Sequence, residues 1–318
     1  MATSEAFSPL VAEGHRRAMG SHGRIVVVAD RGRAGDLVRA GWGRVDDLER
    51  RWSRFLPASE VSAVNRGAGR PVPVSAETLV LFQRAVEGWR GTDGRFDPTV
   101  GAALVAHGYD ADLREVVARP RHGPGPGPGA PAVGPAPGLG GAVVDPWLPA
   151  VALPPGTTFD PGGIGKGLAA DLVVASLLAA GAAGALVEIG GDLRAAGTPP
   201  AGDTWTIAVA DPRLSGREVV RLAVPRGGVA TSSPLRRRWR SAGAEVHHLV
   251  DPATGRPAAP AVAVATVVAG DAWWAEVVAT ALHLTGPAGL DRRADVHALV
   301  VTTDGARHAT PGLAAVLA

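Results

Sequence analysis

The sequence predicts an α+β fold in which most of the sheet is antiparallel. Several short runs that alternate or stay apolar follow one another between residues 185 and 270. A few segments with apolar residues at helical spacing are interspersed, and consecutive strand runs of this kind are typical of antiparallel sheets. With 318 residues and 46% hydrophobic content, the chain is large enough for one sizeable domain or two modest ones.

Four segments define the first third of the chain. The stretch Ser21–Asp30 has a β-branched centre and is predicted to be a strand. Over Ala34–Trp52, apolar residues recur at helical spacing with charges between them, which indicates an amphipathic helix. A second helix is expected to begin at a capping Ser75 and to continue toward Trp89. Residues 94–110 are predicted to form a turn and a short helix.

The segment 118–142, ARPRHGPGPGPGAPAVGPAPGLGGA, is rich in proline and glycine. Proline lacks a backbone donor, and a segment of this composition is not expected to bury apolar area. We therefore predict a disordered surface insertion inside a domain, because neither flank looks self-sufficient. The expected organisation is a flexible N-terminus over residues 1–17 and a single domain over residues 18–318, which the insertion interrupts.

The second half of the chain supplies most of the predicted sheet. Helices are expected over residues 168–179 and 272–286. The predicted strands cover residues 185–192, 205–212, 217–225, 227–233, 245–252 and 261–270. A last strand and turn are expected over residues 295–305.

Composition and charge exclude several kinds of site and partner. The chain has no cysteine, which rules out disulfides, thiolate catalysis and cysteine-based metal centres. Its net charge is +2, so we expect no nucleic-acid partner, and the densest basic run, Arg236–Arg240, is either a solvated strand end or an anion contact. We expect no membrane span, because no run of about eighteen apolar residues occurs. The N-terminus lacks the pattern of a signal peptide, so we expect a cytoplasmic protein.

The chain contains a single lysine, Lys166, in the glycine-rich stretch FDPGGIGKGLAAD. A Walker loop is excluded, because Asp160 stands where its first glycine belongs and Gly167 stands in place of Ser or Thr. The glycine spacing also departs from the dinucleotide pattern GxGxxG. What remains is a glycine-rich turn that opens a helix. Free N–H groups, the positive end of the helix dipole and the lysine charge all favour a phosphate there.

Several stretches in a fixed order resemble the ApbE family, the FAD:protein FMN transferases. They are AMG, SRFLPASEVSAVNR, GRFDPTVG, FDPGGIGKGLAAD, EIGGD, ATSSPLRRRW, HHLVDPATGRP and AEVVATALHLTG. The resemblance covers residues 19–305 and implies a T-fold-like α+β arrangement with packed helices. It also implies a magnesium-dependent transfer of the FMN part of FAD to a Thr or Ser hydroxyl of an acceptor flavoprotein, with release of AMP.

The resemblance also implies roles for individual residues. The metal ligands would be the Gly163 carbonyl, Glu276 and the Thr280 hydroxyl, which are oxygen donors of the kind that Mg²⁺ prefers. The residues expected to bind FAD are Met19, Phe55, Arg95, Phe96, Asp97, Asp160 and Lys166. His248 is the expected acid–base or substrate-positioning residue. The family usually has aspartate where this chain has Glu276. Because Glu276 and Thr280 are four positions apart, one helical face presents both.

Some of these residues have a second interpretation. Asp97 and Asp160 each lie in a Phe-Asp-Pro tripeptide and are either FAD ligands or residues that stabilise a turn. Asp192 either faces the site or caps a turn, and Glu276 is either a metal ligand or an ordinary surface carboxylate. His247 is expected to be structural, because neighbouring residues of a strand point to opposite faces.

Two other functions would use the same residues. In the first, water replaces the acceptor hydroxyl, and the protein is a pyrophosphatase that splits FAD into FMN and AMP. In the second, the change to Glu276 has removed catalysis, and the protein is a flavin-binding carrier.

Overall fold

The computed structural model describes residues 9–119, 133–241, 243–259 and 261–318, which fold around one sheet of eight strands. In spatial order the strands are β1 (Pro9–Ala18), β2 (Ser21–Asp30), β6 (Gly184–Ile189), β7 (Asp192–Gly197), β10 (Gly227–Ser232), β15 (Val262–Ala269), β16 (His297–Thr302) and β17 (Arg307–Ala309). Every neighbouring pair in this sheet is antiparallel. The predicted α+β class and antiparallel sheet are therefore confirmed.

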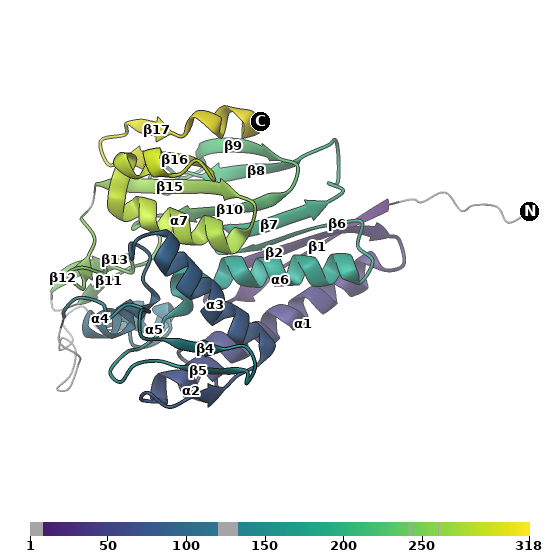
Figure 1. The fold of residues 1–318 in the computed structure, drawn as a ribbon. Coiled ribbons are helices and arrows are strands. Elements are labelled where there is room, and N and C mark those ends of the chain that lie inside the picture. Colours follow the sequence, from purple (N-terminus) through teal and green to yellow (C-terminus); the bar gives the residue numbers. More distant parts are fainter. Residues whose placement is uncertain (1–8, 120–132, 242, 260) are drawn as a thin grey trace, which may run out of the picture.

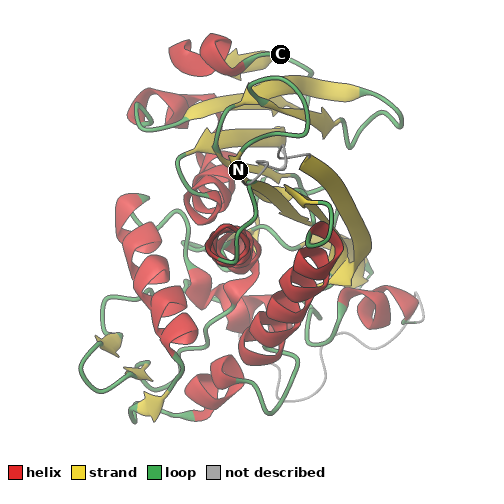
Figure 2. Ribbon diagram, turned by 90° about the vertical axis from the view of Figure 1, so that its right-hand side faces the viewer, coloured by secondary structure: helices red, strands yellow, loops and turns green. Residues whose placement is uncertain are grey.

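The two faces of the sheet are covered by different elements (Figure 1). Three helices pack on one face, namely α1 (Ala34–Trp52), α6 (Gly165–Ala179) and α7 (Ala272–Thr285). The other face is covered by a hairpin of β8 (Trp205–Ala210) and β9 (Glu218–Val224), together with the 3₁₀ helix η4 (Pro311–Val316). Figure 2 shows from the side how the long helices gather against one side of the strands.

Residues 25–29 of β2 are all apolar, because both faces of this strand are buried. Ile25 and Val27 belong to the core beneath the helices, whereas Val26 and Val28 belong to the core beneath the β8–β9 hairpin. Successive residues of a strand point to opposite faces, so a strand that is covered on both sides needs apolar residues at every position.

The remaining elements form a smaller layer beside the sheet. Its helices are α2 (Glu60–Arg66), α3 (Ala76–Gly91), α4 (Gly101–Ala106) and α5 (Leu113–Ala118), with the 3₁₀ turn η1 (Pro98–Val100) before α4. A three-stranded sheet holds β3 (Val72–Pro73), β5 (Ala150–Ala152) and β4 (Val143–Asp145). The short pairs are β11 (Arg238–Ser241) with β12 (Ala244–His247), and β13 (Val250–Asp251) with β14 (Arg256–Pro257). The 3₁₀ helix η3 (Gly286–Arg292) follows α7.

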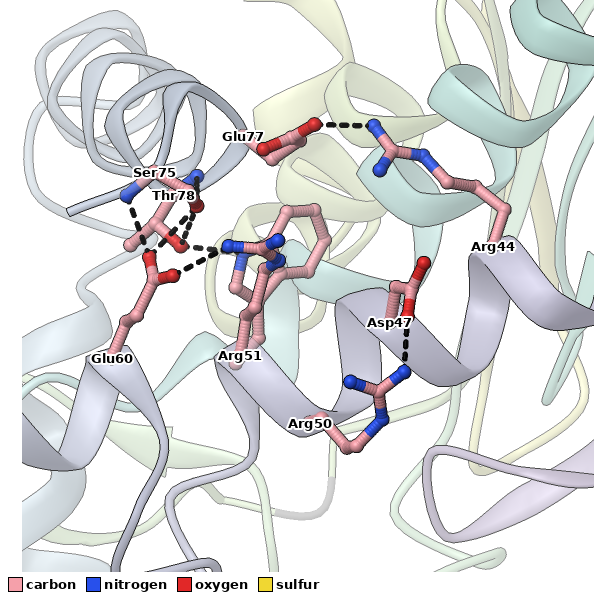
Figure 3. A network of polar contacts seen from close by, with 9 residues as sticks. Arg44, Asp47, Arg50, Arg51, Glu60, Ser75, Glu77 and Thr78 are labelled. Carbon is pink, nitrogen blue, oxygen red and sulfur yellow. Dashed lines mark hydrogen bonds and ion pairs between the residues drawn. The ribbon is translucent and has the colours of Figure 1, made fainter.

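Helix α3 begins at the predicted cap (Figure 3). The Ser75 hydroxyl accepts a hydrogen bond from the Thr78 N–H, as expected of an N-cap. The Ser75 N–H donates to Glu60 at 2.9 Å, and Glu60 also pairs with Arg51 at 2.7 Å. The partner that completes the cap therefore comes from α2 rather than from α3 itself, and it joins α1, α2 and α3.

The prediction of a flexible N-terminus over residues 1–17 is wrong for the part that the structure describes. Residues 9–18 form β1, which pairs with β2 along its whole length, from Pro9 opposite Asp30 to Ala18 opposite Ser21. Its sequence mixes apolar residues with charged residues and glycine, and β1 is the edge strand of the sheet. Pairing through the backbone places it there without a strong side-chain pattern.

The predicted insertion over residues 118–142 lies partly outside the described residues, since 120–132 are not described. The prediction that it buries no apolar area is wrong for the rest. Leu139 is 1% exposed and belongs to the core beneath the helices. The Ala136 N–H donates to the Pro252 carbonyl at 2.7 Å, and the Gly138 N–H donates to the Thr99 hydroxyl at 2.9 Å. Residues 133–142 are therefore anchored to the domain.

One predicted strand is broken. Residues 245–252 form two short strands, because β12 ends at His247 and β13 begins at Val250. The bend between them holds His248. None of the helices in the described residues is long and apolar enough to cross a membrane.

Candidate active site

One cavity of about 1100 Å³ brings together the residues that the sequence assigned to the site. Its lining includes Met19, Phe55, Arg95, Phe96, Asp97, Asp160, Gly163, Lys166, His248, Glu276 and Thr280. These residues are spread over more than half of the chain, so only folding makes them neighbours. The shared cavity shows that these residues are neighbours, and the role of each one stays a prediction.

The turn before α6 is fixed by Asp160. Its Oδ1 atom accepts a 2.7 Å hydrogen bond from the Gly162 N–H, and Pro161 occupies the first position of the 3₁₀ turn η2 (Pro161–Gly163). The predicted helix 168–179 begins earlier, at Gly165, so Lys166 lies in its first turn. Lys166 also lines the cavity.

Glycine is required where α6 meets α7. A Cβ atom built on Gly167 would lie 2.4 Å from the Ala272 carbonyl oxygen, which is a collision with the backbone. The same residue donates its N–H to Oε2 of Glu276 at 2.8 Å. The glycine-rich stretch therefore serves close helix packing, in addition to any approach by a ligand.

Lys166 is paired with two carboxylates. Its Nζ atom lies 2.7 Å from Oδ2 of Asp192 and also forms an ion pair with Glu276. All three side chains are nearly buried, with 12% of Lys166, 6% of Asp192 and 4% of Glu276 exposed. The open question on Asp192 is thus answered, since it faces the site. One cation between two carboxylates leaves the cluster with an excess of negative charge.

The pKa values of the cluster reflect this imbalance. Burial raises the pKa of Glu276 to about 7, and the charge of Asp192 adds to the shift against the opposing effect of Lys166. Burial acts to lower the pKa of Lys166, but the two carboxylates hold that pKa above its ordinary value. An additional cation near Glu276 would favour its charged form.

The expected metal ligands lie close together and are oxygen donors. Thr280 follows Glu276 by one turn of α7, and its hydroxyl oxygen is 3.6 Å from a Cβ atom built on Gly163. One carboxylate, one hydroxyl and one carbonyl fit Mg²⁺ in kind, because water and phosphate oxygens complete its octahedral shell. The described residues include no group of three or more His, Asp or Glu that could hold a metal. Glu276 is buried, so it is not an ordinary surface carboxylate.

Arg54 and Tyr109 form part of the cavity wall together with Phe55. The guanidinium carbon of Arg54 is 4.2 Å from the centre of the Phe55 ring and 4.8 Å from that of Tyr109. Arg54 also pairs with Oδ2 of Asp160 at 2.7 Å. Both oxygens of Asp160 are thus engaged within the protein, which favours the interpretation that it stabilises the turn.

Asp97 and Phe96 also have structural roles. Oδ1 of Asp97 accepts hydrogen bonds from the N–H and the hydroxyl of Thr99, so it caps η1, and burial raises the pKa of its carboxyl. Phe96 is 2% exposed and lies against Gly163, where a built Cβ would be 3.1 Å from its ring. Met19 occupies the turn between β1 and β2 with φ of 49°.

The two adjacent histidines have separate environments. His248 lines the cavity, and its Nδ1 atom is buried with no hydrogen-bond partner in the part of the chain that the structure describes. Burial, and then the charges of Arg237 and Lys166, hold the pKa of His248 well below its ordinary value. His247 packs against His283 instead, with ring centres 6.2 Å apart. The two side chains point to different surroundings, as expected. The cause is the bend after β12 rather than the alternation of side chains along a strand.

Comparison with known proteins decides the family. A model of the ApbE family matches residues 19–300, which include every residue assigned to the site. The chain belongs to the ApbE family. The FAD:protein FMN transferase of Rhodobacter capsulatus is 31% identical over 283 residues, which are 84% of this chain and 51% of that protein. The enzyme of the same name from Vibrio cholerae is 27% identical over 245 residues, 76% of this chain and 71% of that protein.

Solved structures of ApbE proteins share the fold. The ApbE protein of Thermotoga maritima superposes with a TM-score of 0.81 at 27% identity, over 97% of this chain and all of that one. The flavinyl transferase ApbE of Pseudomonas stutzeri gives a TM-score of 0.78 at 24% identity, over 98% of each chain. The family and its relatives place this ApbE protein among the transferases.

Sequence reasoning missed two residues of this ApbE site and left a third open. Arg54 was hidden by the abundance of arginine in the chain, which gives a single arginine little weight. Arg237 belongs to the basic run that was expected to be either a strand end or an anion contact, and it lines the cavity. Tyr109 is the only tyrosine, but nothing in its neighbourhood marks it as part of a cavity. The position of Arg54 directly before Phe55 was the available signal.

Proposed function

We propose that this ApbE protein transfers the FMN part of FAD to a Thr or Ser hydroxyl of an acceptor flavoprotein and releases AMP. The observation that carries the proposal is the convergence on one cavity of all residues that the ApbE motifs single out. The cavity volume of about 1100 Å³ also suits a dinucleotide, since pockets for drug-sized ligands measure roughly 300–1,000 Å³. The relatives described above are FAD:protein FMN transferases, which supports the same reaction.

In the proposed reaction the acceptor hydroxyl oxygen forms a bond to the phosphorus of the FMN half. The bond between that phosphorus and the bridging oxygen breaks, and its electron pair leaves with AMP. The hydroxyl proton has to pass to a base. His248 is the candidate for this role, because it lines the cavity, its ring is neutral, and Nδ1 has no hydrogen-bond partner among the described residues.

Gly163, Glu276 and Thr280 would hold the magnesium ion. When bound, the ion would neutralise phosphate oxygens during phosphoryl transfer. Asp192 provides Lys166 with a second partner, at 2.7 Å, so the lysine stays paired without Glu276. Oε1 of Glu276 could therefore leave Lys166 for the ion without leaving the lysine unpaired.

The experiment supplies the protein with FAD, Mg²⁺ and a candidate acceptor flavoprotein. Covalent flavin is detected as fluorescence in a denaturing gel, and AMP is measured by chromatography. An acceptor whose target Thr or Ser is replaced by Ala is the matched control. We expect labelling and AMP only with the intact acceptor, and a loss of at least 100-fold in His248→Ala, in line with general-base catalysis.

Other outcomes would identify the rival functions. AMP and free FMN in the absence of acceptor indicate a pyrophosphatase. Tight FAD binding without AMP across several acceptors indicates a flavin carrier. Either outcome would contradict the proposed transfer.

A further inference from the structure

The basic run Arg236–Arg240 divides between two environments. Arg238 pairs with a glutamate of the facing strand at 2.7 Å, and Arg240 donates to the carbonyl of Gly243 at 2.7 Å. These two arginines stabilise the β11–β12 hairpin at the surface. Arg237 is half-buried and lines the cavity instead. Arg238 and Arg240 therefore belong to the surface hairpin, whereas Arg237 belongs to the wall of the cavity.

Arg237 is held beside the lysine cluster by an uncharged contact. Its guanidinium donates to the Ser21 hydroxyl at 2.8 Å. A Cβ atom built on Gly190 would lie 2.7 Å from that hydroxyl oxygen and 3.5 Å from Cδ of Lys166. Ser21 and Lys166 thus both lie beside the same glycine. The Arg237 carbonyl also accepts the N–H of His248 at 3.4 Å, which places this arginine beside the expected base.

Two other cations of the cavity, Lys166 and Arg54, already have acidic partners. Lys166 is shared by Asp192 and Glu276, and Arg54 is paired with Asp160. Across the described part of the chain, no salt bridge includes Arg237. The guanidinium of Arg237 has five N–H groups, and only one of its terminal nitrogens donates to the Ser21 hydroxyl. Most of these donors are left for a ligand.

We infer that Arg237 binds a phosphate oxygen of the ligand in this cavity. A guanidinium is always charged and presents a planar fork that matches phosphate geometry. Lys166 brings no net positive charge, because two carboxylates surround it. Arg17, Arg95 and Arg236 also line the cavity, but they are exposed, whereas Arg237 is half-buried and so presents its charge inside the cavity. The inference rests on the proposed function for one point only, namely that the phosphate is part of the FAD pyrophosphate.

The test compares Arg237→Gln with Arg240→Gln, which removes the same charge from the same run outside the cavity. FAD affinity is measured by the change in flavin fluorescence, and riboflavin, which has no phosphate, is titrated in parallel. We expect Arg237→Gln to weaken FAD binding by about 10- to 100-fold, because hydrogen bonds to charged groups contribute at that level. Riboflavin affinity and the Arg240→Gln variant should match the wild type. Arg237→Lys should lose less than Arg237→Gln, because it keeps the charge.

Inorganic pyrophosphate separates this inference from the proposed function. Without magnesium, pyrophosphate should raise the melting temperature of the wild type but not of Arg237→Gln. That result supports the assignment even if the wild type binds no FAD, an outcome that would count against the proposed function alone. Equal FAD affinity in Arg237→Gln and the wild type would overturn the inference. So would an equal loss of FAD and riboflavin binding, or a pyrophosphate shift that Arg237→Gln retains.

Discussion

The backbone N–H of Gly167 donates a 2.8 Å hydrogen bond to the carboxylate of Glu276. This contact joins the first turn of α6 to the middle of α7, two helices that are far apart in the sequence. It forms because Gly167 has no side chain that would strike the Ala272 backbone, 2.4 Å from the position of a Cβ atom. The orientation of Glu276, on which the proposed metal site depends, is therefore tied to a glycine in another helix.

Replacing Gly167 by alanine should force the two helices apart. We expect Gly167→Ala to lower the free energy of unfolding by about 1–3 kcal/mol, as for overpacked cores, measured by urea denaturation. Gly43→Ala is the matched control, because this glycine lies in α1 and a Cβ atom there meets nothing within 4 Å. It should stabilise the protein by up to about 1 kcal/mol. Equal stability of Gly167→Ala and the wild type would show that the helix contact is not tight.

Helix α7 is also capped by a residue of α6. The Asp171 carboxylate accepts the N–H groups of Ala272 and Trp273, both at 2.9 Å, while the N-cap residue Asp271 makes no side-chain cap. Burial raises the pKa of Asp171 to about 6, although these two hydrogen bonds and Arg194 oppose the shift. In the native state this carboxyl therefore binds its proton more tightly than in the unfolded chain.

This shift predicts a specific pH dependence of stability. A raised native pKa makes unfolding release a proton between about pH 4 and pH 6, so the contribution of Asp171 to stability falls as the pH rises through that window. Between pH 5 and pH 7 the loss should be about 1 kcal/mol. In Asp171→Asn this contribution is absent, so its unfolding free energy should depend less on pH. Urea denaturation of both proteins at pH 5 and pH 7 checks this. An identical pH dependence in the two proteins would contradict it.

The sequence predicted the elements that carry a strong local pattern. Strand β2 and helix α1 have the predicted bounds, because a β-branched run and a regular apolar spacing specify them locally. Strand β1 was missed because its place is fixed by backbone pairing with β2 at the sheet edge. Leu139 was missed because composition describes the average of a segment, whereas burial depends on where one side chain lands.

The site was predicted through motifs rather than through geometry. The motif positions placed Glu276 and His248 at one cavity, which spacing alone does not show. The ion pairs of Lys166 with Asp192 and of Arg54 with Asp160 join segments distant in sequence, so local pattern carries no signal for them. The sequence left Arg237 open between a strand end and an anion contact, because its environment depends on the bend before β11.

The anchored part of the Pro/Gly-rich segment should contribute to stability through one side chain. Leu139 is 1% exposed, so Leu139→Ala should leave a cavity and lower the free energy of unfolding by about 2–5 kcal/mol. Val133, in the same segment, is 43% exposed, and Val133→Ala should change it by less than about 0.5 kcal/mol. Chemical denaturation of the two variants measures the difference. Equal, small effects would mean that the segment only rests on the surface.

The last prediction concerns Glu276, at a position where the family resemblance implies aspartate. In the structure its two oxygens reach Lys166 and the Gly167 N–H, so the longer side chain spans from α7 to α6. Aspartate is one methylene shorter. We expect Glu276→Asp to lose the hydrogen bond to Gly167, at about 1 kcal/mol of stability, while it keeps the charge and the FMN transfer of the proposed function.

Glu276→Gln should behave in the opposite way. An amide of the same length fits the space between α6 and α7, so the variant should fold. It carries no negative charge, and a neutral amide oxygen is a poor ligand for Mg²⁺ in competition with water. FMN transfer to an acceptor should therefore be lost at every magnesium concentration, while FAD binding without magnesium persists. The measurement is a magnesium titration of transfer for the wild type, Glu276→Asp and Glu276→Gln, with circular dichroism as the check on folding. If Glu276→Gln titrates like the wild type, the carboxylate is not a metal ligand, and its contacts with Lys166 and Gly167 serve only to join the two helices.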